Sequence, residues 1–193
     1  IMTITISTAA HNAATNAVTA LIGASGYLRY RTAGTLASPG TIVATLGLSA
    51  DAFADAVAGV ATANAITSDT NATGNVAAVT TATVEKSDGT IIIHCSAGNT
   101  VTTTITGSSG ETTITVGSAT GLSAGMHVSG TGIAAGADII DINGTTVYLS
   151  AENTGSVSGN GTFSHDVVID GNVIIDAGSV VTCTSLTYRA TKA

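Results

Sequence analysis

The sequence predicts a mainly β protein, either a β-sandwich or an open barrel, with one N-terminal helix and an inserted small β-module. Short runs of Thr, Val and Ile recur about every 8–12 residues. Gly-bearing turns separate them, as in GLSAGMHVSGTGIAAGADIIDINGTTVYLS (121–150), because glycine suits turns and bulges that need a positive φ. No regular alternation of strand and helix patterns is present, which argues against a Rossmann-type parallel sheet.

The N-terminal segment predicts a strand followed by a helix. TITIS (3–7) alternates Thr and Ile with the period of a strand. Ser7 or Thr8 can then cap a helix that Gly23 ends. The apolar residues of this helix recur at the spacing of one helix face: Ala10, Ala13, Ala14, Ala17, Val18, Leu21 and Ile22.

The rest of the first half predicts further strands. They are YLRYRT (27–32), TIVATLGLS (41–49) and the two arms of a hairpin at 76–85 and 91–96. Asp88-Gly89, between the two arms, is a strong hairpin signal. The Ala-rich residues 51–65 fit either a short helix or a loop that runs into a strand.

The second half changes to Thr, Ser and Gly with scattered Val and Ile. Its predicted strands are 112–116, 126–130, 138–142 and 146–150, with a second hairpin signal at Asn143-Gly144. Residues 152–162 are typical of a linker or a long hairpin tip, and 165–190 return to a β pattern around the turn at 176–179. We therefore expect a β-rich host domain of 1–99 together with 165–193, interrupted by a small β-module at 100–164.

The composition favours a protein that contacts other proteins. Of the residues, 44% are hydrophobic but only 3% are aromatic, so each core side chain buries little area. Only 9% are charged, and the net charge is −7. A freely diffusing monomer with so few charges is prone to self-association, so we expect part of the surface to be buried against other protein.

The same composition argues against nucleic acid and membrane as partners. Five Lys and Arg are too few to neutralise a run of phosphates. Arg29 and Arg31 share one face of a predicted strand, which we expect to be solvated, with a small basic contact as the alternative. No apolar segment of about 20 residues predicts a spanning helix, and no export signal is visible at the N-terminus.

No pattern of residues predicts a catalytic, cofactor or metal site. His11, His94, His127 and His165 fall in four different segments without metal-ligand spacing, and the adjacent His94 and Cys95 point to opposite faces of a strand. No GxSxG elbow or phosphate-binding loop is present. We expect Cys95 and Cys183 to be buried thiols rather than a disulfide. The chain is therefore expected not to be an enzyme and to hold no cofactor.

Two further sets of polar residues are candidate sites. The acidic residues of the second half are expected to be solvated turn carboxylates, although Asp138 and Asp141 could offer oxygen ligands to calcium; the others are Asp166, Asp170 and Asp176. Three asparagines match glycosylation acceptors, a match expected by chance in so Thr-rich a chain: Asn71, Asn143 and Asn160.

The stretch 121–159 resembles a β-module of many tailed-phage structural proteins and some bacterial surface proteins. The shared residues are Gly125-Met126, Val128-Ser129-Gly130, Gly132-Ile133, Gly136 and Thr146-Val147, while Ala134 replaces a usual proline. The flanks TISTAAHNAATNAVTALIG, LRYRTAG, IVATLGLS, the SDGT hairpin and IIDAGSVVTCTSLTYRA resemble a group of small phage virion proteins commonly encoded near capsid genes. This group has no defined catalytic motif.

This resemblance implies a capsid decoration (cement) protein that binds the outer capsid lattice and the major capsid protein, assembled in the host cytoplasm. The alternatives are a tail or head-fibre component and a surface adhesin or carbohydrate-binding module. The last would use aromatic side chains, of which the chain offers Tyr27, Tyr30, Tyr148, Tyr188, Phe53 and Phe163.

The low surface charge and small core side chains further predict a homo-oligomer, either a trimer or a dimer. Residues 3–22 are the expected contact, because an exposed alternating strand invites pairing with another chain and an Ala-rich helix allows close approach. The alternative is that 3–22 covers the protein's own sheet.

Overall fold

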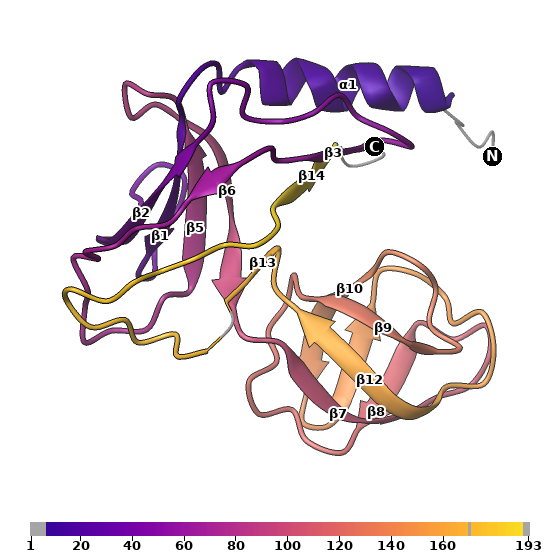
Figure 1. Ribbon diagram of the computed structural model, residues 1–193. Coiled ribbons are helices and arrows are strands. Elements are labelled where there is room, and N and C mark those ends of the chain that lie inside the picture. The colour runs from indigo at the N-terminus through magenta and orange to yellow at the C-terminus, as the bar shows by residue number, and fades with distance from the viewer. Residues whose placement is uncertain (1–6, 170, 191–193) are drawn as a thin grey trace. The chain divides into compact units, whose positions relative to one another are not determined.

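The computed structural model describes residues 7–169 and 171–190 and shows a mainly β chain with one helix, α1 (Thr8–Ala20), in the described part (Figure 1). This confirms the predicted fold class. The expected strand at 3–7 lies almost wholly outside the described residues.

The chain divides into two compact units. Unit 1 holds Ile1–Cys95 and Ile174–Ala193, and unit 2 holds Ser96–Val173. Unit 2 is wider than the expected module of 100–164, because β13 (Val167–Val168) pairs in parallel with Ala97 and Gly98 and so keeps both flanks of the module in one unit.

Unit 1 contains most of an antiparallel sheet in the order β6-β5-β1-β2-β4 (Figure 1). These strands are β1 (Tyr27–Arg31), β2 (Ile42–Leu48), β4 (Ile66–Thr67), β5 (Thr81–Glu85) and β6 (Ile91–Gly98), whose last residues belong to unit 2. A second sheet pairs β3 (Val60–Thr62) with β14 (Thr187–Arg189), and α1 packs against both of its strands.

Alternation along the central strands separates an apolar core from a polar face. The core side chains are fully buried and include Leu28, Tyr30, Leu46, Ala82 and Val84. The hairpin predicted between β5 and β6 is confirmed, since Lys86 N donates to Thr90 O at 2.9 Å and Gly89 has a φ of 85°. The first arm is shorter than predicted, because β5 begins only at Thr81.

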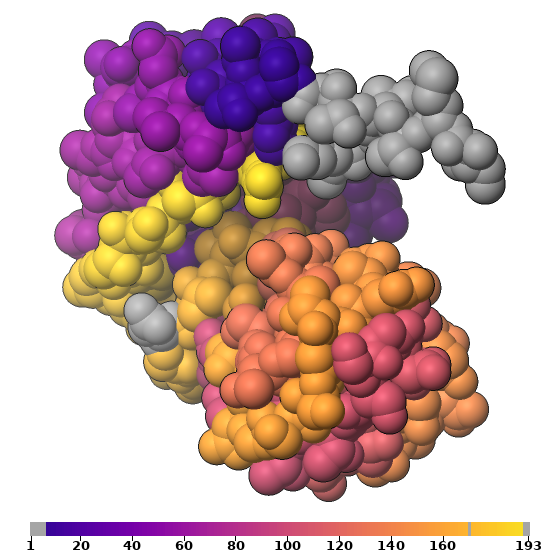
Figure 2. Space-filling view, turned by 90° about the vertical axis from the view of Figure 1, so that its right-hand side faces the viewer, coloured from indigo at the N-terminus to yellow at the C-terminus, as the bar shows by residue number. Residues whose placement is uncertain are grey.

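Two stretches of unit 1 contain less regular structure than their sequence patterns allow. Residues 51–65 form no helix; they run through isolated bridges into β3, as the alternative interpretation predicted. Residues 174–190 contain only the short strand β14. They run over unit 1 as the yellow band of Figure 2 and bond its backbone at single points, such as Val181 to Asp69. Apolar and polar residues alternate in this segment because its side chains are alternately buried and exposed, although no continuous ladder of strand hydrogen bonds is formed.

Unit 2 is a closed barrel in the order β10-β11-β8-β7-β12-β9 (Figure 1). The strands are β7 (Val101–Thr106), β8 (Thr113–Val116), β9 (His127–Thr131), β10 (Ala137–Asn143), β11 (Thr146–Leu149) and β12 (Ser158–Ser164). Asn143-Gly144 turns β10 into β11, as predicted. Ile105, Ile114, Val147 and Phe163 are among the buried residues of its core.

The prediction of a linker or hairpin tip at 152–162 was wrong for residues 158–162, where β12 pairs with both β7 and β9. Its sequence, SGNGTFS, has one large apolar residue, so periodicity does not reveal a strand. Gly161 is buried, and a Cβ there would lie 2.7 Å from Ile105 Cγ2. Glycine is used here to admit the Ile105 side chain, and not only to form turns.

Candidate functional site

The helix α1 is capped at its N-terminus and contains no charged side chain. Ser7 caps it, because Ser7 Oγ accepts a hydrogen bond from Ala10 N at 3.2 Å, and Gly23 follows it with a φ of 68°. No charged residue stands between Thr8 and Ala20. The helix therefore has no acidic first turn or basic last turn, and its stability depends on what its two faces contact.

The inward face of α1 is polar. His11, Thr15 and Thr19 are its buried residues, and they recur at every fourth position. Thr15 Oγ1 donates to Gly59 O at 2.8 Å, and His11 Nε2 donates to Ala190 O at 2.6 Å. The side chains of α1 thus satisfy backbone groups of the segments beneath it.

Two asparagines complete this inward face. Asn12 Oδ1 accepts from Gly59 N at 2.6 Å, and Asn16 Oδ1 accepts from Ala56 N at 2.7 Å. Residues 54–59 make few ladder hydrogen bonds of their own, so their backbone groups need such partners. Gly59 has a φ of 84°, and a Cβ there would overlap the His11 ring. Close approach and polar bonding together fix which face of α1 turns inward.

The outward face of α1 is consequently apolar. It consists of exposed small or aliphatic residues with no polar side chain among them: Ala9, Ala10, Ala13, Ala14, Ala17, Ala20 and Leu21. Leu21 is 58% exposed. Val57, in the segment that bonds to α1, is 76% exposed. An amphipathic helix normally buries its apolar face, so α1 has the reverse orientation for an isolated chain.

This orientation was not evident from the sequence. The apolar spacing of Ala10, Ala13, Ala14 and Ala17 is real, but these residues face outward. The alternative prediction was that residues 3–22 cover the protein's own sheet. The described part of this stretch does pack on β3 and β14, but through the polar side of the helix. The signal that could have revealed the inward face is the repeat of bonding side chains at Asn12 and Asn16, flanked by the buried threonines.

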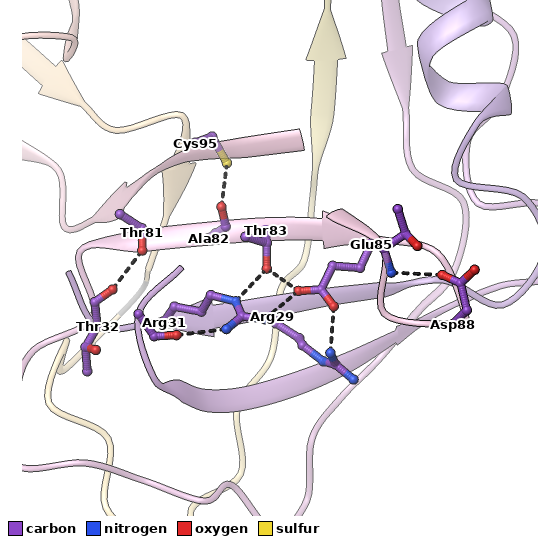
Figure 3. Close-up of polar contacts among 11 residues, drawn as sticks. Arg29, Arg31, Thr32, Thr81, Ala82, Thr83, Glu85, Asp88 and Cys95 are labelled. Carbon is purple, nitrogen blue, oxygen red and sulfur yellow. Dashed lines mark hydrogen bonds and ion pairs between the residues drawn. The ribbon is translucent and has the colours of Figure 1, made fainter. Parts of the chain in front are cut away.

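A buried ion-pair network lies on the polar face of the unit 1 sheet (Figure 3). Glu85 is fully buried and accepts hydrogen bonds from Arg29 NH1 at 2.6 Å and Arg31 NH2 at 2.7 Å. Thr83 Oγ1 accepts from Arg31 Nε at 2.9 Å and donates to Glu85 at 2.6 Å. Arg29 also lies over the Tyr27 ring, 4.8 Å from its centroid.

This network corrects the expectation of a solvated arginine face. Arg31 is only 7% exposed, and one of its nitrogens donates to Gly40 O at 2.8 Å. The arginines are held by a buried carboxylate and by backbone, which assigns them a structural role in this sheet.

In unit 2, His127 lies between two carboxylates. Its Nδ1 is 2.5 Å from Asp138 Oδ1, and its Nε2 is 3.1 Å from Asp166 Oδ1. The hydrogen bond to Asp166, opposed by partial burial and assisted by Asp138, raises the pKa of His127 to about 9. Burial alone would raise the pKa of Asp166, but hydrogen bonds from His127 and Ser96 hold it at about 2.

The arrangement of these groups is not that of a nucleophilic triad. The Ser96 hydroxyl donates to Asp166 at 2.7 Å, and the carboxylate separates it from the His127 ring. A base that activates a serine must itself contact the hydroxyl. The cluster instead ties β9, β10 and the segment after β12 to one another.

The remaining candidate residues are dispersed over the structure. His94 and His165 are half-buried, and burial lowers the pKa of His165. Cys95 and Cys183 are half-buried thiols that no disulfide joins, whereas burial was expected. The other residues of these sets that the structure describes are exposed: Asp141, Asp176, Asn71, Asn143 and Asn160. Asp170 lies outside the described residues.

The aromatic side chains are mostly withdrawn from the surface. Tyr30, Phe53 and Phe163 are buried, and Tyr27 and Tyr188 are half-buried. Tyr148, at 38%, is the one aromatic among the exposed large hydrophobic residues of 7–169 and 171–190.

Within the described ranges, no group of three His, Cys, Asp or Glu side chains is placed to hold a metal ion. No helix there is both long and apolar enough to cross a membrane. Comparison of the chain with protein-family models, curated proteins and solved structures gives no match.

Proposed function

We propose that this chain is a non-enzymatic structural protein of a virion, of the capsid decoration (cement) type. It binds the outer capsid lattice and joins neighbouring major capsid proteins. The observation that carries the proposal is the outward face of α1, which is apolar, uncharged and made of small residues, while the polar side chains of the same helix are used internally.

The physical argument is that such a face is stabilised by burial against protein. Small side chains let another backbone approach closely, and the absence of charge removes the desolvation cost that a charged face would carry. A single contact of this size is weak. A dimer or trimer on a regular lattice makes two or three such contacts at once, so modest affinity per contact suffices for stable attachment.

Two further features support the proposal. Only 9% of the residues are charged, as expected for a chain whose surface is largely buried against other proteins. The resemblance of 121–159 and of the flanks to phage virion proteins supplies the class of partner, the major capsid protein. We further propose that the protein docks as a dimer or trimer.

The experiment uses substitutions on the outward face of α1. Ala13→Glu and Ala17→Glu place a carboxylate on this face without touching the inward hydrogen bonds. Both variants are expected to fold, as judged by cooperative thermal unfolding, and to lose binding to purified capsids that lack the protein. Ala135→Glu, at an exposed turn of unit 2, is the matched control and is expected to bind as the parent does.

Copy number separates the proposal from its alternatives. Quantitative mass spectrometry of mature virions is expected to find hundreds of copies per particle, as a lattice-bound protein requires. A few copies per particle would indicate a tail or fibre component instead. Full capsid binding by both α1 variants would contradict the assigned surface.

A further inference from the structure

An open cavity of about 290 Å³ lies on the outside of the unit 2 barrel. The end of β7, the loop that follows it and strands β8 and β11 form this cavity. Its lining is rich in hydroxyl groups, from Thr106, Ser108, Thr113, Thr115 and Thr146, and Glu111 adds a carboxylate. This volume is at the lower end of the range for small-ligand sites.

Strand register explains why the hydroxyl groups gather there. Thr115 is the cross-strand partner of both Thr106 and Thr146, so three hydroxyls form one row over three strands. The neighbours of these residues along each strand, such as Ile105 and Ile114, are buried in the barrel core. Because side chains alternate, the whole threonine row must face outward.

Tyr148 lies beside this row. It is the cross-strand partner of Thr113 on one side and of Asp141 on the other. The other aromatic residue of unit 2, Phe163, is fully buried. A partly exposed ring next to hydroxyl groups offers a flat apolar surface and a set of directional hydrogen-bonding groups at one place.

The loop that bounds the cavity is held in place from within. Asn153 is 3% exposed, and its Nδ2 donates to Ser108 O at 3.0 Å and to Thr113 O at 3.1 Å. Asn153 N also donates to Glu111 O at 2.8 Å. These bonds fix the loop before any ligand arrives, which reduces the ordering cost of binding.

The charge of this surface restricts the ligand. Glu111 lines the cavity and Asp141 is the cross-strand partner of Tyr148, so both bring negative charge to this face. The sequence has no Lys or Arg between 96 and 173. Phosphorylated, sulfated or carboxylated ligands would meet repulsion with no counter-charge. The lining also has few apolar side chains, so it offers no pocket for the apolar anchors of a peptide.

We propose that this face binds a neutral saccharide, with one pyranose ring against the Tyr148 ring and its hydroxyls bonded to the threonine row and Glu111. Saccharides combine apolar C–H faces with dense hydroxyl groups, which matches the ring and the hydroxyl lining. This activity goes beyond capsid attachment and uses unit 2 alone, so its test and the α1 test have independent outcomes.

The test applies the full chain to an array of neutral oligosaccharides built from glucose, galactose, mannose or N-acetylglucosamine, with sialylated and sulfated glycans beside them. The best probe is then titrated by calorimetry. At least one neutral glycan is expected to bind, and the acidic glycans are not. Tyr148→Ala is expected to weaken binding by roughly tenfold, the size of one lost stacking contact, while Tyr148→Phe stays close to the parent.

Thr115→Val provides a second arm that preserves shape and does not depend on Tyr148. It is expected to weaken binding severalfold through loss of a hydroxyl. Thr102→Val, at an exposed position of β7 outside the cavity lining, is the matched control and should bind as the parent does. The proposal is overturned if no neutral glycan binds at millimolar concentration, if acidic glycans bind better, or if Tyr148→Ala and Thr115→Val both bind like the parent.

Discussion

At the scale of single residues, His127 is the group whose protonation matters most for unit 2. Its folded pKa of about 9 lies above the usual value of 6.5, so the protonated form stabilises the fold. This contribution is fully present below about pH 6.5 and is lost as the pH rises through 9. The His127 side chain is 50% exposed, so solvent screening reduces the contribution to about 1 kcal/mol.

We therefore predict that unit 2 loses about 1 kcal/mol of unfolding free energy between pH 6.5 and pH 10 through this group. Urea unfolding of the parent and of His127→Gln at several pH values measures it. The difference between the two proteins should shrink as the pH rises, because other groups titrate equally in both. A difference that is constant over this range would contradict the prediction.

Residue-level sites of this kind could be predicted from the sequence only in part. Arg29 and Arg31 were correctly placed on one face of a strand, since alternation is local. Their partner Glu85 lies more than 50 residues away and comes into contact only through the pairing of β1 with β5. No local pattern marks a glutamate as fully buried, and so the sequence predicts a solvated face where the structure has the network.

At the scale of elements, β12 shows what glycine does inside a small barrel. We predict that Gly161→Ala lowers the unfolding free energy by about 1–3 kcal/mol, because the added methyl group meets Ile105 in a filled core. Combined with Ile105→Val, which removes a methyl group nearby, the substitution should cost less than the sum of the two single changes.

Denaturant unfolding of the two single variants and the double variant tests this coupling. Gly155→Ala is the control, because its φ is not positive and the nearest atom, Gly132 Cα, is 3.8 Å from the added Cβ. Gly155→Ala is expected to leave the unfolding free energy unchanged or slightly higher, because replacing a glycine reduces the entropy of the unfolded chain. An equal loss of stability for the two variants would contradict crowding against Ile105 as the cause.

Helices and strands were predictable where the apolar residues recur with one clear period. The hairpins at Asp88-Gly89 and Asn143-Gly144 and the strands β1, β2 and β11 were predictable from alternation and turn residues. The helix was predictable as a helix, but its orientation was not, because hydrogen bonds to irregular backbone outweigh the burial of alanine, which releases little free energy. The strand β12 has too few apolar residues to carry a period.

At the scale of the whole molecule, each unit contains a core of its own. All six strands of the barrel lie within Ser96–Val173. We predict that residues 96–173 expressed alone fold with a cooperative thermal transition and dispersed amide resonances. An unstructured fragment would show that unit 2 depends on unit 1 for folding.

The change in strand composition near residue 100 predicts an inserted module. The bounds of unit 2 could not be predicted in the same way, because they depend on the pairing of β6 with β13, two segments about 70 residues apart in the chain.

Closure of the barrel also affects how readily copies of this protein aggregate at high local concentration. With few charges to keep copies apart, the main hazard is growth of cross-β aggregates through unpaired backbone groups. The barrel closes on itself, and one edge of the unit 1 sheet is β4, a strand of only two residues. A template of that length holds an incoming strand poorly. At the other edge, β13 pairs with only Ala97 and Gly98 of β6. Topology therefore limits cross-β growth at the barrel and at β4, where most proteins rely on surface charge.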